Sequence, residues 1–149
     1  MNPQLLAQPR NIHHVEFGAA LTVFNILMCG LHPYSYFDPT RKSACGTPDE
    51  NLKKGRCPLG TGSDCKLPRG NWYNLWSHLT YNLKSSFIQT FRNGHHNPSQ
   101  RATLATLEDN LAELLHVMKK DPVRLELNPT KAKTKIDFPN NNPAFSIPF

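Results

Sequence analysis

The chain has 149 residues, of which 38% are hydrophobic and 13 are proline, and it carries a formal net charge of +6. This length fits one domain, and the apolar residues, gathered in periodic stretches, exclude a fully disordered chain. Four cysteines are too few for a disulfide scaffold at this length, and they slightly favour an intracellular location. We expect a single domain over residues 1–138 and an extended C-terminal tail over residues 139–149.

The positive charge lies in the irregular parts of the chain. Residues 38–70 hold seven Lys and Arg against four Asp and Glu, and residues 119–149 hold six against three. Each segment therefore has a net charge of +3, whereas the remainder is neutral. Such a distribution suits an acidic protein, nucleic acid or an anionic lipid, and it is equally typical of ordinary solubility charge.

The first predicted helix begins at Asn11, whose side chain is suited to capping it, and ends near Cys29 and Gly30. Its apolar run, residues 17–31, is shorter than the roughly 20 residues that a membrane span requires. We therefore expect no membrane partner. Because this helix is apolar nearly all round, we expect it at the centre of the fold or within an interface, with Cys29 buried.

The segment from residue 38 to residue 70 is a Cys/Gly/Pro-rich block in which proline and glycine recur too often for a long helix or strand. A structureless loop of this length is uncommon in a compact domain. We expect a disulfide, a metal ion or a partner to fasten it.

The cysteines of this block are the candidate metal ligands. Cys45, Cys57 and Cys65 would need His32 or His78 as a fourth ligand. The tight C-x₂-C pair usual in structural zinc sites is missing, so we predict no cofactor and retain zinc as the alternative.

Two amphipathic helices follow, at about 71–93 and 99–120. The predicted start of the first is Asn71, and Asn93-Gly94 is expected to close it in a left-handed turn. Apolar residues recur in steps of three and four at Trp72, Leu75, Trp76, Leu79, Leu83, Phe87 and Phe91, and again at Leu104, Leu107, Leu111, Leu114 and Met118. The short connector predicts an antiparallel helical hairpin. The fold class is therefore mainly α with three principal helices.

The last part of the chain alternates between apolar and charged residues. This pattern predicts a small β-hairpin over residues 123–138. Three lysines, Lys131, Lys133 and Lys135, share one face of its second strand, as a row that contacts phosphates would, or as the protected edge of a sheet. The tail offers Phe145 and Phe149 as separated anchors.

The histidines give a weak chemical signal. Adjacent residues on a helix point in different directions, so the doublets His13-His14 and His95-His96 are poor chelates, and we interpret the second as a solvated loop, with a metal or acid–base role as the alternative. His78 is expected at the surface or at the boundary of the core. Cys57 beside His95 or His96 would supply a nucleophile and a base, but no family signature surrounds it.

We expect a non-enzymatic structural or accessory subunit of a larger assembly, such as a viral particle or an organelle complex. Its predicted partners are other protein subunits, including copies of itself. The predicted contacts are the basic loop, the aromatic helix face with Trp72 and Trp76, the three lysines, and the tail residues Phe145 and Phe149. A nucleic-acid-binding protein is the first alternative, and a thiol- or metal-dependent enzyme is the second.

Overall fold

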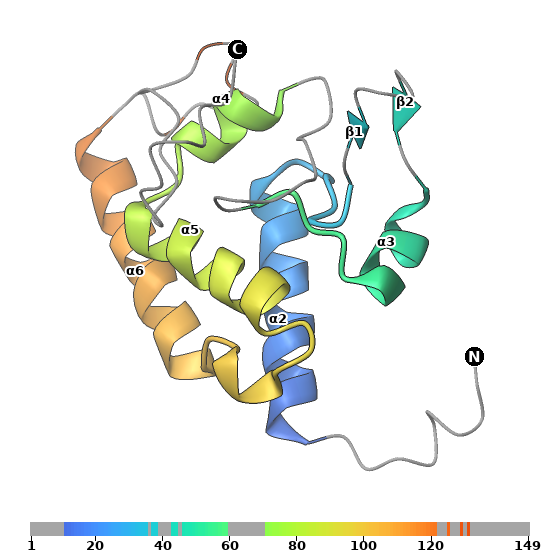
Figure 1. Cartoon of the computed structure of the whole chain (residues 1–149). Helices are drawn as coiled ribbons and strands as arrows, with labels where there is room; N and C mark the ends of the chain where they lie inside the picture. The colour runs from blue at the N-terminus through green and yellow to red at the C-terminus, as the bar shows by residue number, and fades with distance from the viewer. Residues whose placement is uncertain are drawn as a thin grey trace, which may run out of the picture.

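The computed structural model describes residues 11–35, 37–38, 43–44, 46–59 and 71–121, together with residues 125, 129 and 131. This part of the chain is mainly helical, as the sequence predicts. Figure 1 shows α2 in the middle of the molecule, with α5 and α6 on one side of it and α3 on the other. None of the helices described is long and apolar enough to cross a membrane.

Helix α2 (Ile12–Leu27) begins where the sequence predicts. The Asn11 side chain accepts a hydrogen bond from the backbone N–H of His14, which satisfies one of the free donors of the first turn. The helix ends before Cys29 (φ +52°) and Gly30 (φ +89°), both in the left-handed region. Cys29 is exposed, so the prediction that it is a buried small hydrophobe was wrong: it follows the last helical turn and points away from the core.

The 38–70 block holds more regular structure than the sequence analysis predicted. Two-residue strands β1 (Phe37–Asp38) and β2 (Ser43–Ala44) pair antiparallel, and helix α3 (Pro48–Lys54) follows. A complete capping box starts α3, because Thr47 and Glu50 bond each other's backbone N–H groups. Gly55, at φ +68°, closes the helix.

The helix predicted over 71–93 is divided into three pieces. Helix α4 (Trp72–Ser77) ends at His78, and α5 (Tyr81–Ile88) continues into a π-helical turn, η1 (Gln89–Asn93). Thr80 causes the break, since its backbone is extended and its side chain caps α5 by accepting a hydrogen bond from the N–H of Leu83 at 3.3 Å. The apolar period continues across the break, so periodicity alone did not detect it.

Gly94 follows η1, but its φ is −84°, so the predicted left-handed cap was wrong. Its N–H bonds the carbonyl of Gln89 at 2.7 Å, which closes the wider π turn. A Cβ on Gly94 would lie 2.6 Å from Cγ of Arg101 and 2.7 Å from the carbonyl oxygen of Thr90. This position needs glycine because two other groups approach the backbone closely.

Helix α6 (Leu104–Lys120) begins after a short 3₁₀ turn, η2 (Pro98–Gln100), and it is capped by Thr103, so it begins a few residues later than the predicted start at about residue 99. Residues early in the preceding helix contact residues late in α6, so the two segments run in opposite directions. Asn82 bonds Glu113 at 2.9 Å, the Asn110 side chain contacts Ser86, and the N–H of Ala102 bonds the Thr90 side chain at 3.0 Å. Figure 1 shows the two helices side by side.

An aromatic cluster joins these helices. The Phe24 ring, fully buried in α2, lies 5.7 Å from Trp72, 5.1 Å from Phe87 and 5.6 Å from Phe91, measured between ring centroids. Tyr34 extends the cluster, because its hydroxyl donates to the carbonyl of Phe91 at 2.7 Å. One core therefore holds α2, α4, α5 and the segment after α2 together.

The predicted β-hairpin and the tail over 139–149 lie outside the described residues, apart from residues 125, 129 and 131. Lys131 is exposed, and its backbone carbonyl accepts a hydrogen bond from the His78 ring at 3.3 Å.

Candidate interaction surface

The side of α2 that faces away from the core carries apolar and small residues and no Lys, Arg, Asp or Glu. We call this side the outer face of α2; it consists of Ile12, Val15, Gly18, Ala19, Thr22, Val23 and Ile26, of which Ala19 and Val23 are half-buried and also pack against the core. Ile12 is 56% exposed, Val15 46% and Ile26 70%. A groove of about 650 Å³ runs along it, and the described residues that line this groove are His14, Val15, Gly18, Ala19, Thr22 and Val23.

The sequence of α2 explains why this face is left over. The buried residues Glu16, Ala20, Phe24 and Met28 recur every four positions and form a single stripe against the core. Because α2 is apolar all round and the core covers only this stripe, a second apolar side of the helix is left outside the core. The expectation of a helix at the centre of the fold is confirmed for one side only.

The shape of the outer face follows from residue size. Gly18, Ala19 and Thr22 are small and lie in the middle, whereas bulkier Ile12 and Ile26 lie near the two ends. A Cβ added at Gly18 would meet no atom within 4 Å, which confirms that the middle is open. Side chains therefore protrude less at the middle of the outer face than at its two ends.

A buried polar network lies near the start of α2. Glu16 is 3% exposed, and one of its carboxylate oxygens bonds the His13 ring at 3.1 Å. Arg101 donates to the backbone carbonyl of His13 at 2.9 Å and to that of Gly94 at 2.8 Å, and its guanidinium lies 4.8 Å from the centroid of the Phe17 ring. Burial lowers the pKa of Arg101. This network anchors α2 to the turn before α6.

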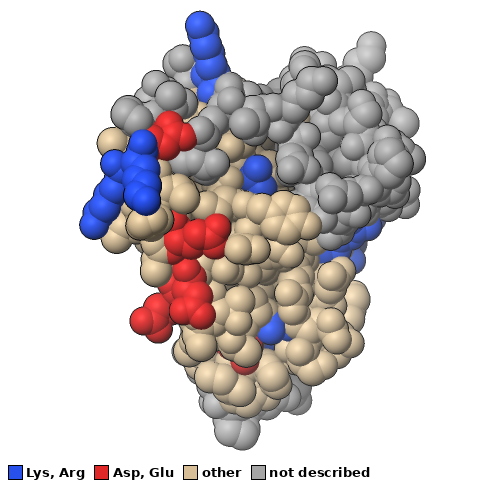
Figure 2. All heavy atoms as spheres, turned by 90° about the vertical axis from the view of Figure 1, so that its left-hand side faces the viewer, with Lys and Arg blue, Asp and Glu red and all other residues tan. Residues whose placement is uncertain are grey.

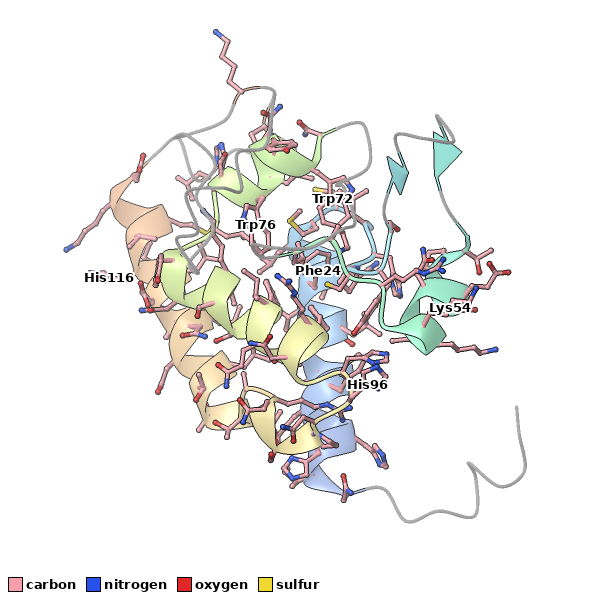
Figure 3. The ribbon with its side chains drawn as sticks, in the orientation of Figure 1. Phe24, Lys54, Trp72, Trp76, His96 and His116 are labelled. Atoms are coloured by element: carbon pink, nitrogen blue, oxygen red, sulfur yellow. The ribbon has the colours of Figure 1, made fainter. Side chains whose placement is uncertain are left out.

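The predicted aromatic contact face is not exposed. Trp72 and Trp76 are each 1% exposed and belong to the core, so the interpretation of the stripe as a partner surface was wrong for the described conformation. Figure 3 shows both rings directed into the molecule near Phe24. The apolar stripe that includes Trp72 and Trp76 packs against α2 and the other helices, and not against a partner.

The structure describes one of the three candidate cysteines and the histidines His78 and His95. Cys57 is buried, with its Sγ 3.6 Å from the carbonyl oxygen of Pro33, whereas Cys45 and Cys65 lie outside the described residues. Over the described ranges no group of three or more His, Cys, Asp or Glu is arranged to hold a metal ion. His78, expected at the surface or at the boundary of the core, is 7% exposed because it closes α4 against the core. His95, expected in a solvated loop, is half-buried.

The charged side chains lie on another surface. Figure 2 shows the side with α6, along which acidic side chains gather. Glu108, Asp109 and Glu113 come from α6, and Lys119 and Lys120 follow in its last turn, where they complement the helix dipole. Of the predicted lysines, Lys133 and Lys135 lie outside the described residues, as do Phe145 and Phe149.

Comparison with known proteins gives no match among family models, curated proteins or solved structures. The candidate surface is therefore argued from its own geometry.

Proposed function

We propose that the protein is a non-enzymatic structural or accessory subunit of a larger assembly, and that it binds a second copy of itself through the outer face of α2. The observation that carries this proposal is the exposure of Ile12, Val15 and Ile26 on a helix face that has no Lys, Arg, Asp or Glu and a groove along it. Isolated exposed apolar residues are ordinary on a protein surface, but apolar residues grouped along one helix face are typical of an interface.

The spacing of the outer face supports a copy of the same chain as the occupant. Ile12 and Ile26 lie seven residues on either side of Ala19, and Val15 and Val23 lie four residues on either side. An antiparallel pair of α2 helices with its two-fold axis at Ala19 would therefore pair isoleucine with isoleucine and valine with valine. Two-fold interfaces require such self-complementarity, because the same patch serves both subunits.

The residue sizes support the same arrangement. Ile12, Val15, Ala19, Thr22 and Ile26 follow steps of three and four, the repeat of a helix–helix seam. Small residues at the middle allow the two backbones to approach closely, while the larger residues fill the ends. A nucleic acid does not suit this face, since no Lys or Arg is among the described residues that line its groove.

The remaining contacts stay predictions of the same proposal. They are the basic loop over 38–70, the lysines of the predicted β-hairpin, and the tail over 139–149, which would bind further subunits. The sequence predicts one continuous helical hairpin over 71–93 and 99–120. We propose the hairpin only for the part in which α5 pairs with α6.

The test is the mass of the protein in solution. Sedimentation velocity over a range of concentrations should give a dimer for the wild type and a monomer for Val15→Glu, because pairing would bury a charge opposite Val23. Leu115→Glu is the matched control, since Leu115 is 54% exposed but lies on α6. A wild type that is monomeric throughout, or a Val15→Glu variant as large as the wild type, would contradict the proposal.

Cross-linking tests the direction of pairing. Ala19→Cys should form a disulfide dimer under mild oxidation, because the two copies of residue 19 meet at the axis. The native Cys29 should not cross-link, because it lies ten residues beyond Ala19, just past the end of α2, so the two copies are roughly 30 Å apart in the antiparallel pair. Dimers linked through Cys29 would indicate parallel helices and would overturn the two-fold arrangement.

A further inference from the structure

The end of α3 lies against the turn that contains His95 and His96. Nε2 of His95 contacts the carbonyl oxygen of Leu52. A carbonyl oxygen accepts but does not donate, so Nε2 carries the proton and Nδ1 has the free lone pair. Nδ1 is buried, and it has no hydrogen-bond partner among the described residues.

Gly55 brings the second imidazole nitrogen into the same place. A Cβ at this position would lie 3.0 Å from Nδ1 of His95 and 3.2 Å from Nε2 of His96. The two rings are nearly perpendicular, with centroids 4.2 Å apart. One nitrogen atom of each imidazole therefore lies on the same side of Gly55, and the two rings approach its backbone closely because residue 55 lacks a side chain. Figure 3 shows His96 between α2 and the end of α3.

We propose that Nδ1 of His95 and Nε2 of His96 bind a divalent late transition-metal ion, such as Zn²⁺, Ni²⁺ or Cu²⁺. Imidazole nitrogen is a preferred ligand of these ions, which bind at roughly 2.0–2.1 Å in the case of zinc. His96 is exposed, so its ring has room to turn toward an ion held by His95. Water molecules complete the coordination.

The contact between His95 and Leu52 supports this site. A metal-bound histidine usually donates its other ring N–H to a carbonyl or carboxylate, which fixes the tautomer and the ring orientation. His95 already has this arrangement. A helical doublet directs its rings apart, but His95 and His96 follow Gly94 in a turn, and this turn lets both nitrogens face Gly55. The site is separate from the outer face of α2.

The test is calorimetric titration of the full-length, metal-free protein with Zn²⁺. We expect one equivalent to bind, and we expect His95→Ala/His96→Ala to abolish binding. His116→Ala is the control, because His116 is exposed on α6, away from this turn, and its loss should leave zinc binding unchanged. Gly55→Ala retains both imidazoles but places a methyl group against both ring nitrogens, so it should weaken binding by at least about tenfold.

Two further measurements keep the result interpretable. His96→Ala removes an exposed side chain, so this variant should fold. If Gly55→Ala fails to fold, the loss of zinc binding in His96→Ala tests the site instead. Co²⁺ distinguishes the ligands, because thiolate gives an intense charge-transfer band that imidazole does not give. One equivalent of zinc retained without His95 and His96, or a thiolate band that places the metal on the cysteines, would overturn the proposal.

Discussion

At the scale of single residues, several polar side chains are buried and have a structural purpose. Asn51 in α3 is 1% exposed, and its amide donates to the carbonyl of Tyr34 at 2.8 Å. Tyr34 in turn donates its hydroxyl to Phe91. These bonds run from α3 through the segment after α2 to the π turn. They join a short helix of the loop block to the main core.

Burial raises the pKa of Tyr34, and it also raises the pKa of Tyr73. The folded state therefore retains the phenol protons more strongly than the unfolded state, whose tyrosines titrate near pH 10. The stabilisation is complete below that pH and is lost as the pH rises above it. We predict that the free energy of unfolding, measured in urea from about pH 8 to about pH 11, falls by up to about 1.4 kcal/mol per pH unit for each tyrosine.

Tyr34→Phe should flatten this dependence, since it removes one of the two phenols. At neutral pH the same variant should be destabilised by about 1–3 kcal/mol, because the buried carbonyl of Phe91 loses its donor. An equally steep alkaline loss in the variant would show that other groups cause the dependence.

At the scale of elements, the sequence predicts what depends on neighbours along the chain. The cap of α2 at Asn11 was predicted correctly, because it needs only a local hydrogen bond. The loop block contained a signal that we did not interpret. Thr47, Pro48 and Glu50 form a capping box with proline in the first turn, and Gly55 ends the helix seven residues later than Pro48.

Other features depended on tertiary packing and could not be predicted in this way. The break at Thr80 leaves the apolar period unchanged, so the sequence indicates one helix where two exist. Gly94 was assigned a left-handed turn, but its role is to let Arg101 and Thr90 approach. The candidate surface was predicted only in part for a related reason: the sequence indicates that α2 lies at the centre of the fold or within an interface, but not which side of it the core covers.

The capping box of α3 gives a prediction at this scale. Thr47→Ala removes the acceptor for the N–H of Glu50, so we expect a loss of about 1 kcal/mol in the free energy of unfolding. Thr47→Asp should restore most of it, since aspartate caps equally well and suits the positive end of the helix dipole. Urea unfolding of the three proteins measures the difference. Equal stability of wild type and Thr47→Ala would show that α3 unfolds separately from the core.

At the scale of the whole molecule, α2 has two sides with different purposes. The side with Phe24 contacts Trp72, Phe87 and Phe91 and holds the fold together. The opposite side contributes little to the stability of one chain but supports the proposed pairing of two. One helix thus links folding to assembly, and substitutions on its two sides should have separable effects.

This separation gives the last prediction. Phe24→Ala should lower the free energy of unfolding by about 3–5 kcal/mol, because it opens a cavity among three aromatic rings. Val15→Glu should change the stability of the monomer by no more than about 0.5 kcal/mol, since Val15 lies at the surface. A dimer that dissociates on unfolding has a melting temperature that rises with protein concentration. We therefore expect this rise in the wild type and in Leu115→Glu but not in Val15→Glu. A concentration dependence that persists in Val15→Glu would place the contact between subunits elsewhere on the molecule.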